Sequence, residues 1–541
     1  MPGITNRNRP SRLRAIWLAL VVVAAACTSD VESSSTEDPA STAVTEAADT
    51  VGSTSAAGTT ADEEATDPLA GESVAFESCV DDVPLSCGVV AVPVDYDDAS
   101  AGTIDIAVAV HRATSPEDRI GYLFINPGGP GGSGVEYAYA AALGAGAAFT
   151  EAVLQRFDIV GFDPRGVAQS EPFFECGAVG EQVGLLIQID GAVDTEKEVA
   201  LGEQAVALCV ESMGPAAALL GSEAVARDMD EIRKALGADQ ISYFGASYGS
   251  TLGTWYATLF PDRVRAMVVD GADNPVDDLS DGAARIENSI EEGRQFEALL
   301  NEALLACDFP ECPIFNDGDP IGYYRDRVDE LDLVNEAFAG DKTAGALAVI
   351  TPLYDEATWP ELWNGLAALE QGDAQPLIDL AAFQLGESGG GANFTGHVNC
   401  LDQWSLQPDF DRTTQLEDVT AAEAATASEL PLLSELGLLT APDPCPFYDT
   451  IVARPLGQPL DGGDVPIVVI GNPSDPATPF TESVELVDAT LSNGFLVEAD
   501  HPAHVVYPSN DCVNDLVDGV FIDLLLPEHR RTVCPAAPAD G

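Results

Sequence analysis

The chain has 541 residues and carries 90 Asp and Glu against 23 Lys and Arg, a formal net charge of −67. A nucleic acid needs a basic surface to bind, so this composition argues against a nucleic-acid partner. Hydrophobic residues make up 46% of the chain, which excludes global disorder and allows one large α/β domain with an insertion, or two to three domains.

The first 27 residues have the pattern of an export signal. Arginines between Arg7 and Arg14 precede the apolar stretch Ala15–Ala26, which ends in three alanines before Cys27. This stretch is too short to span a membrane, so we expect residues 1–26 to be removed as a signal peptide. A cysteine directly after small residues resembles a bacterial lipobox. Cys27 is therefore the expected lipid-attachment residue, with plain secretion as the alternative, and the lipid would be the only contact with the membrane.

Residues 28–72 contain no lysine, arginine or aromatic residue and consist mostly of Ser, Thr, Ala, Gly, Asp and Glu. Such a segment cannot bury enough apolar surface to offset the entropy lost on ordering. We expect residues 27–78 to hold the lipid-bearing cysteine and a disordered acidic linker. Either export route then puts the protein on the extracellular side of a bacterial membrane or in the medium.

The cysteine content fits an oxidising compartment. Without Cys27 ten cysteines remain, an even number that suits five disulfides. Pairing of neighbours is the simplest hypothesis, and the sequence leaves the connectivity open: Cys79–Cys87, Cys176–Cys209, Cys307–Cys312, Cys400–Cys445 and Cys512–Cys534. Zinc binding is the competing interpretation. The chain has no C-x-x-C and its five histidines show no ligand spacing, so no metal site is expected.

From residue 79 onward short apolar runs alternate with helical patterns. The predicted strands are Ile104–Val110, Tyr122–Ile125, Phe157–Phe162, Ile241–Phe244, Val264–Val269, Val465–Ile470 and Phe495–Val497, and the predicted helices are Glu223–Leu236 and Ser250–Phe260. Continuous apolar strands separated by helices indicate a parallel sheet covered on both faces. Between residues 276 and 460 the alternation stops, and Ala, Leu and Glu dominate. We expect a mainly helical insertion there, between the core segments 79–275 and 461–541.

A glycine-rich loop, N-P-G-G-P-G-G-S-G, occupies residues 126–134 after the second of these strands. Such loops leave backbone N–H groups free to meet an oxyanion, and we assign one donor to Gly129. A phosphate-binding loop is the rival interpretation, but no G-K-[ST] follows and no acidic residue stands at dinucleotide spacing. A merely flexible loop is the remaining alternative.

Residues 157–166, F-D-I-V-G-F-D-P-R-G, predict a strand that ends in a turn. We expect Asp163 and Arg165 to brace loops through hydrogen bonds and an ion pair. Their predicted role is structural rather than catalytic.

The strongest motif is G-A-S-Y-G at residues 245–249, a G-x-S-x-G between a predicted strand and a predicted helix. A serine in this place occupies a strained turn that exposes its hydroxyl above the sheet. The helix N-terminus behind it favours negative charge that develops nearby. We therefore assign Ser247 as the nucleophile and the N–H of Tyr248 as the second oxyanion donor. A chance match in a glycine-rich chain is the alternative.

The three motifs together resemble the α/β-hydrolase superfamily, and more narrowly its secreted tripeptidyl-aminopeptidase-like branch, related to proline iminopeptidases. Members of that branch carry a G-G-P-G-G-S-G oxyanion loop, an F-D-x-x-G-x-D-P-R-G strand end and a G-x-S-Y-G elbow. The resemblance runs from about Cys79 to Cys534. It implies an α/β-hydrolase fold: a mostly parallel central sheet, helices on both faces and a helical cap insertion.

The resemblance also implies that an acid and then a histidine follow the serine along the chain. The acid should stand on a loop after a strand. Residues 471–479, G-N-P-S-D-P-A-T-P, follow the strand Val465–Ile470 and are similar to the family's D-x-x-T-P. Asp475 is the expected acid, and Asp464 and Asp488 lie outside that loop.

The catalytic base is expected at His504. Residues 501–504 read H-P-A-H where the family usually has G-x-G-H, so both glycines are replaced and His501 is the alternative. His504 would take the proton of Ser247 and return it to the leaving amine. Three further histidines are not expected to be the base, because of their position in the chain or their charged surroundings: His111, His397 and His529.

An exopeptidase needs an anionic group to bind the free amine of its substrate, and carboxylates do this in the related iminopeptidases. Asp402, in V-N-C-L-D, resembles a cap motif of the family, and Glu136 follows the oxyanion loop. Both are candidates for substrate binding. In a chain with 90 acidic residues, the alternative for each is a solvated carboxylate.

These expectations combine into an exported serine hydrolase that releases short peptides or single residues from a peptide with a free N-terminus, through an acyl-enzyme. It needs no cofactor. An esterase or lipase on the same triad is the runner-up, because fold and triad do not distinguish ester from amide. A non-catalytic surface binding protein is the third interpretation, and the intact set of Ser247, Asp475 and His504 argues against it. An epoxide hydrolase or dehalogenase is disfavoured because the elbow carries Ser rather than Asp.

Overall fold

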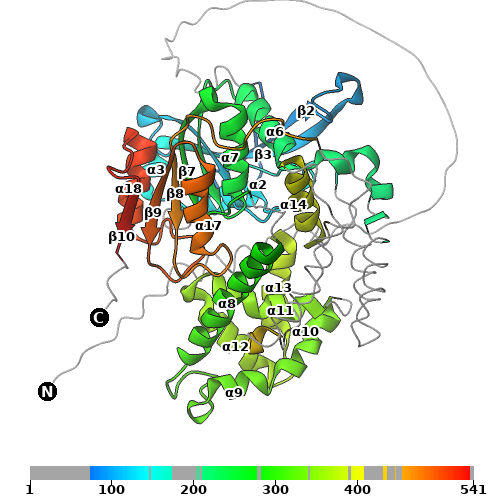
Figure 1. Cartoon of the computed structure of the whole chain (residues 1–541), viewed down its shortest axis with the longest axis vertical. Helices are drawn as coiled ribbons and strands as arrows, with labels where there is room; N and C mark the ends of the chain where they lie inside the picture. The colour runs from blue at the N-terminus through cyan, green and yellow to red at the C-terminus, as the bar shows by residue number, and fades with distance from the viewer. Residues whose placement is uncertain are drawn as a thin grey trace, which may run out of the picture. The chain divides into compact units, whose positions relative to one another are not determined.

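A computed structural model of the chain describes residues 73–535, with several gaps (Figure 1). The gaps are residues 145–147, 174–203, 205, 208–209, 277–281, 339–341, 388–391, 407–429, 435, 437–444 and 446–453. The predicted signal peptide, Cys27, the linker up to residue 72 and the Cys176–Cys209 pair therefore lie outside the described residues.

A ten-stranded sheet forms the centre of the described chain, in the order β1-β2-β3-β5-β4-β6-β7-β8-β9-β10. Its strands are β1 Glu77–Ser78, β2 Ser86–Pro93, β3 Thr103–His111, β4 Gly121–Asn126, β5 Phe157–Phe162, β6 Ile241–Ala246, β7 Val264–Asp270, β8 Ile467–Gly471, β9 Gly494–Ala499 and β10 Arg531–Cys534. The pairs β1–β2, β2–β3 and β3–β5 are antiparallel, and all other pairs of the sheet are parallel. The predicted mostly parallel sheet is confirmed, and each predicted strand lies within two residues of the observed one.

The sheet separates two hydrophobic cores, because successive side chains of a strand point to opposite faces. In β4, Tyr122 and Phe124 enter one core, and Leu123 and Ile125 enter the other. Strands with apolar side chains on both faces must be covered on both, which is why the sequence reads as continuous apolar runs.

Helices cover both faces of the sheet (Figure 1). The core that holds Phe124 also contains side chains of α6 (Ser222–Ala235) and α7 (Gly249–Leu259), and α17 (Phe480–Glu485) packs against it. The opposite core contains side chains of α2 (Gly134–Ala142), α3 (Glu151–Arg156) and α18 (Asp511–Asp518). This is the layered arrangement that the sequence predicts.

Between β7 and β8 the described elements are helices. They are α8 Gly282–Leu305, α9 Pro320–Arg325, α10 Asp332–Ala337, α11 Lys342–Ile350, α12 Trp359–Leu369, α13 Gln375–Glu387, α14 Ala392–Leu406 and α16 Pro431–Ser434, with short turns such as η7 Thr351–Tyr354. Most of their buried side chains form a third core, from Phe296 to Leu436. Helix α14 is different, since Phe394, Val398 and Leu401 belong to the core of the sheet.

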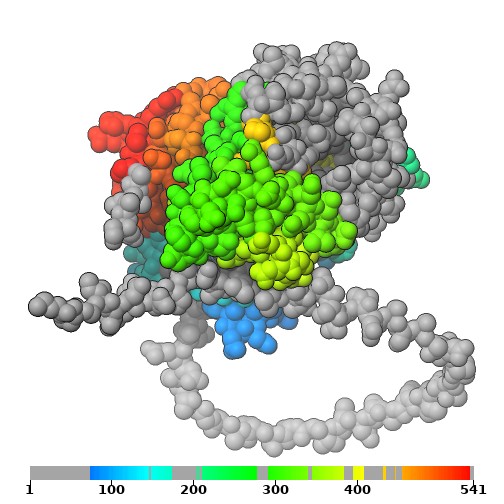
Figure 2. Space-filling model, turned by 90° about the horizontal axis from the view of Figure 1, so that it is seen from below, coloured from blue at the N-terminus to red at the C-terminus, as the bar shows by residue number. Residues whose placement is uncertain are grey.

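The helical segment contacts the sheet domain at two loops. Asp355 forms an antiparallel bridge with Ala503, and Glu356 N–H donates to the Pro502 carbonyl at 3.1 Å. On α14, Thr395 Oγ1 donates to the Pro130 carbonyl at 3.0 Å. Figure 2 shows the green part of the chain beside the orange C-terminal part. These contacts bring the insertion onto the same loops that carry the predicted chemistry.

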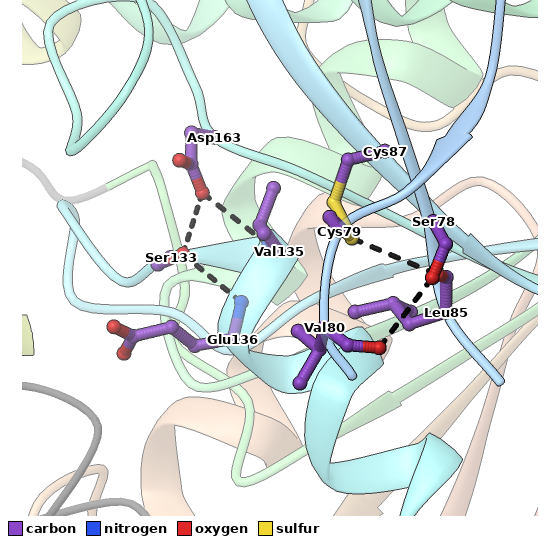
Figure 3. Close-up of a disulfide and its surroundings, with 9 residues drawn as sticks. All are labelled: Ser78, Cys79, Val80, Leu85, Cys87, Ser133, Val135, Glu136 and Asp163. Atoms are coloured by element: carbon purple, nitrogen blue, oxygen red, sulfur yellow. Dashed lines mark hydrogen bonds between the residues drawn. A yellow bond between two sulfur atoms is a disulfide. The ribbon is translucent and has the colours of Figure 1, made fainter. Parts of the chain in front are cut away.

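Four of the five predicted disulfides are present in the described residues. They are Cys79–Cys87, Cys307–Cys312, Cys400–Cys445 and Cys512–Cys534. Figure 3 shows the first of them, which joins the residue after β1 to β2. None of the described helices combines the length and the apolar character needed to cross a membrane.

Candidate active site

Ser247 stands on a strained turn between β6 and α7. Its φ is 56°, in the left-handed region that non-glycine residues rarely adopt. Gly245 and Gly249 make this turn possible, because a Cβ on Gly245 would lie 2.3 Å from the Gly249 carbonyl oxygen. The N–H of Ser247 donates to the Asp270 carbonyl at the end of β7, at 2.9 Å. This is the geometry that the G-x-S-x-G pattern predicts for a nucleophile.

Asp475 and His504 are hydrogen-bonded to each other. The Nδ1 of His504 lies 2.8 Å and 2.9 Å from the two carboxylate oxygens of Asp475. The exposed fractions are 6% for His504 and 1% for Asp475. The N–H groups of Ala477 and Thr478 and the Thr478 hydroxyl donate to the same carboxylate, at 2.9 to 3.0 Å. Asp475 is thus fixed by its own loop and orients one nitrogen of the imidazole.

The environment of His504 favours the imidazolium. Burial alone lowers the pKa of His504, but the charge and hydrogen bonds of Asp475, with smaller contributions from Asp270 and Glu292, raise it above its ordinary value. The other nitrogen, Nε2, is buried and has no hydrogen-bond partner within the described part of the chain. It is the nitrogen available to exchange a proton.

Ser247 and His504 are held to the same strand end. Gly271, directly after β7, touches the imidazole: a Cβ there would lie 2.9 Å from Cε1 and 3.0 Å from Nδ1 of His504. The Asp270 carboxylate accepts the N–H of Val506 at 3.1 Å and of Tyr507 at 2.8 Å, just after the histidine. Asp270 therefore fixes the elbow through its carbonyl and the histidine loop through its side chain.

The glycine-rich loop lies directly against the elbow. Gly128 and Gly129 have φ values of 103° and 110°, which L-residues with side chains rarely adopt. A Cβ on Gly128 would lie 2.6 Å from the Ala246 carbonyl oxygen and 2.7 Å from Ser247 Cβ. Only backbone fits between this loop and the serine. The N–H groups of Gly129 and Tyr248 are the candidate oxyanion donors.

Asp163 and Arg165 have the structural roles that the sequence predicts. Asp163 follows β5 and accepts hydrogen bonds from Ser133 Oγ at 2.5 Å and from the Val135 N–H at 3.3 Å (Figure 3). These hydrogen bonds fix the end of the glycine-rich loop and the start of α2 to the turn after β5. Arg165 is fully buried and donates to both oxygens of Asp228, at 2.6 and 2.7 Å. The ion pair joins α6 to the turn after β5.

The two carboxylates expected to bind substrate lie in different surroundings. Glu136 is exposed on the first turn of α2, beside the glycine-rich loop, and partial burial and the charge of Asp163 raise its pKa (Figure 3). Asp402 is buried, and both of its oxygens accept hydrogen bonds from Ser222. Both carboxylate oxygens of Asp402 therefore have a hydrogen-bond partner within the protein.

The structure brings two further carboxylates to the site. Asp270 ends an apolar strand, a signal that the sequence contained. Glu292, on α8, had no such signal. The residue as a whole is exposed to solvent. Nearby protein atoms nevertheless desolvate its carboxylate, and this desolvation, followed by the charges of Asp273 and Asp475, raises the pKa of Glu292 to about 7, while His504 acts in the opposite direction.

Glu292 lies on the face of α8 that approaches the base. Phe296 follows it by one helical turn and so shares that face. The Phe296 and Tyr354 rings have centroids 5.9 Å apart, and Tyr354 in turn contacts the His504 ring at 5.4 Å. Glu292 is thus an ionisable group of the insertion within electrostatic range of the Asp475–His504 pair.

The fold and the comparisons define the class of protein, a serine hydrolase with the α/β-hydrolase fold. Residues 122–313 match the family model described as alpha/beta hydrolase fold, and residues 436–534 match the model described as TAP-like protein. The chain belongs to the α/β-hydrolase superfamily and, within it, to the TAP-like serine peptidases that its motifs indicate.

Three relatives are similar over most of their length. Serine protease Hip1 of Mycobacterium tuberculosis is 34% identical, over 81% of this chain and 85% of that protein. Tripeptidyl aminopeptidase of Streptomyces lividans is 30% identical, over 85% and 87%. A protein of Mycobacterium tuberculosis named carboxylesterase B is 31% identical, over 83% and 86%.

Proposed function

We propose that this protein is an exported serine peptidase that removes short peptides from the free N-terminus of its substrates, with Ser247, His504 and Asp475 as its triad. The observation that carries the proposal is the Asp475–His504 hydrogen bond at 2.8 Å, held to the same strand end as the strained Ser247. Relatives named serine protease and tripeptidyl aminopeptidase support a peptide substrate.

In the proposed reaction Ser247 Oγ attacks the carbonyl carbon of the scissile amide while His504 Nε2 takes the hydroxyl proton. The carbonyl oxygen becomes an oxyanion and accepts hydrogen bonds from the N–H groups of Gly129 and Tyr248. Asp475 keeps the proton of the imidazole on Nδ1 and stabilises the imidazolium. The imidazolium then protonates the leaving amine, and the amide C–N bond breaks.

The resulting acyl-enzyme is an ester of Ser247. Water attacks it, His504 takes a proton from that water, and a second tetrahedral intermediate forms in the same oxyanion hole. Collapse of the intermediate releases the peptide carboxylate and returns the proton to Ser247. The side chains of this chain supply every proton transfer, so the reaction needs no cofactor.

Amine recognition is assigned to the insertion. A free α-amino group is cationic at neutral pH, and it is stabilised by a carboxylate at the closed end of the substrate site. Glu292 is the better candidate because of its solvent access and its electrostatic interaction with Asp475 and His504, and Glu136 is the second. Residues 276–460 then act as a cap between the core segments 79–275 and 461–541.

Export is proposed on two grounds. The sequence begins with a basic, apolar and small-residue pattern that ends at Cys27, and the described chain contains four disulfides. A lipid on Cys27 would hold the enzyme on the outer side of the cell membrane, with residues 28–72 as the tether, since residues 77–78 already belong to strand β1 of the sheet.

Three fluorogenic substrates test the proposal on the chain that begins at Thr28. They are a peptide amide with a free amine, its N-acetylated twin and a short acyl ester, each with the Ser247→Ala variant as control. We expect turnover of the free-amine peptide and little of its acetylated twin, because the twin has lost the cation. Ester turnover without cleavage of either peptide would reject the peptidase and support an esterase, the activity suggested by the name of one relative.

A further inference from the structure

A chain of three buried polar side chains links the helical insertion to the residue after Ser247. Its members come from three elements: Asp402 from α14, Ser222 from the start of α6, and Tyr248 from the elbow. Their exposed fractions are 7%, 0% and 7%. The Ser222 hydroxyl donates to Asp402 Oδ2 at 2.5 Å and is also hydrogen-bonded to the Tyr248 hydroxyl.

The direction of these hydrogen bonds follows from the donor inventory. Burial raises the pKa of Asp402 to about 7, and above that pH its carboxylate can only accept. The single O–H of Ser222 donates its hydrogen bond to Asp402, so the Tyr248 O–H must be the donor in its hydrogen bond with Ser222 Oγ. The other carboxylate oxygen, Oδ1, accepts the Ser222 N–H at 2.8 Å. Asp402 thereby fixes both the backbone and the side chain of Ser222, and through them the ring of Tyr248.

Close packing leaves this arrangement little freedom. Gly221, at the start of α6, approaches α14 so closely that a Cβ there would lie 3.0 Å from Asp402 Oδ1 and 3.4 Å from Leu401 Cβ. Tyr248 and Leu401 belong to the same hydrophobic core. A shift of α14 relative to α6 would therefore move the Tyr248 side chain.

The same helix also holds the opposite side of the oxyanion hole. Thr395 Oγ1 donates to the carbonyl of Pro130, the residue after Gly129, at 3.0 Å. Thr395 and Asp402 are seven residues apart in α14, which is two helical turns, so they lie on one face. One face of α14 thus contacts the glycine-rich loop directly, through Thr395, and reaches the elbow through Ser222.

We propose that α14 positions the oxyanion hole, with Asp402 acting through Ser222 on Tyr248 and Thr395 acting through Pro130 on Gly129. This inference rests on the proposed serine hydrolase mechanism. Neither Asp402 nor Thr395 touches the substrate, so both are positioning residues. Their removal should weaken the binding of the tetrahedral oxyanion and leave the binding of the ground-state substrate almost unchanged.

The test uses Asp402→Asn, Ser222→Ala, Tyr248→Phe and Thr395→Val in the chain that begins at Thr28. The readouts are kcat and KM for the best substrate of the three above, and the inhibition constant of a matching trifluoromethyl ketone. That inhibitor forms a hemiketal oxyanion with the serine. We expect kcat to fall about 10- to 100-fold, KM to change less than about threefold, and inhibitor affinity to fall in parallel with kcat.

Two controls separate positioning from general packing. Tyr256→Phe removes a buried hydroxyl from the same helix α7, away from the elbow, and should leave kcat and inhibitor affinity within about twofold of wild type. Thr395→Ser keeps the hydroxyl and should restore most of the activity that Thr395→Val loses. In a double-mutant cycle, Asp402→Asn should lower kcat little further once Tyr248→Phe is present, because both substitutions break the same chain of hydrogen bonds.

Two results would overturn the inference. One is a lower melting temperature with unchanged kcat and inhibitor affinity, which would reduce Asp402 to core packing. The other is full additivity of Asp402→Asn and Tyr248→Phe. Activity that survives in Ser247→Ala would instead reject the triad itself, and so distinguishes a failure of the proposed function from a failure of this inference.

Discussion

The Tyr354 ring meets the His504 imidazole edge to face, with centroids 5.4 Å apart and planes inclined by 82°. The backbone N–H of His504 also donates a hydrogen bond to the backbone carbonyl of Tyr354 at 2.8 Å. Tyr354 belongs to the insertion and His504 to the sheet domain, so the insertion orients the proposed catalytic base. Tyr354→Leu keeps the backbone bond and removes the ring contact. We predict that kcat falls about tenfold while the melting temperature changes by only a few degrees. Unchanged kcat would show that the ring merely fills space.

Alanine substitution of the two histidines in the H-P-A-H segment should lower kcat to very different extents. His504 is bonded to Asp475, whereas the His501 carbonyl accepts a hydrogen bond from Asn472. His504→Ala should lower kcat by roughly 10⁴-fold or more, and His501→Ala by much less. Steady-state kinetics on both variants, with circular dichroism as the folding control, checks this. A larger loss in His501→Ala would move the base to His501.

The pH dependence of kcat should report the Asp475–His504 pair. His504 must be neutral to accept a proton, so kcat rises with pH through the pKa of His504, which Asp475 helps to hold above its ordinary value. Asp475→Asn removes the negative charge and lowers that pKa. The acidic limb of the profile should therefore move to lower pH, while the maximal kcat falls by roughly 10⁴-fold. A limb that stays in place would mean that another group titrates.

Glu292→Gln tests the proposed amine site. We predict that KM for the free-amine peptide rises about tenfold, as expected for a lost charge-assisted hydrogen bond, and that KM for the ester is unchanged. In the wild type, KM for the free-amine peptide should rise as pH falls below about 7, since protonation removes the charge of Glu292. This pH dependence should disappear in the variant. Glu136→Gln is the matched comparison, and a larger effect there would move the amine site to α2.

The lipid anchor can be tested separately from catalysis. In the native host, Cys27→Ser should move the enzyme from the membrane fraction to the medium, with kcat unchanged, because the proposed triad lies entirely within the described residues 73–535. Mass spectrometry of the wild-type N-terminal peptide should find a diacylglycerol on Cys27. A wild-type chain already found in the medium, with a different N-terminus, would contradict the anchor.

The sequence predicts the central strands well, because each is a continuous apolar run bounded by turn residues. Three strands at the two ends of the sheet escaped prediction for physical reasons. Strand β1 has two residues, β10 has four of which one is buried, and β2, next to the short β1, mixes exposed and buried positions. The burial of an edge strand depends on its neighbours, so its own sequence carries a weaker pattern.

The candidate site, like the sheet, was predictable from the sequence only in part. Ser247 was predictable because its motif is local, and the Asp475–His504 pair because each follows a strand in a known order. Asp402 has an acidic side chain in a family-like motif, and only the fold shows that Ser222 bonds both of its oxygens. Glu292 is one of 90 acidic residues, and its proximity to the triad arises only when α8 folds back over the sheet domain.

The contacts of the insertion also limit how this enzyme can diversify. Tyr354 touches His504, Thr395 holds the glycine-rich loop, and Asp402 holds Ser222, which in turn is hydrogen-bonded to Tyr248. A cap with these contacts is not an exchangeable module. Grafting the insertion of another hydrolase onto this core, or deleting it, would remove these contacts together with the α14 side chains that pack in the core of the sheet, so new specificities should arise by substitutions within the insertion.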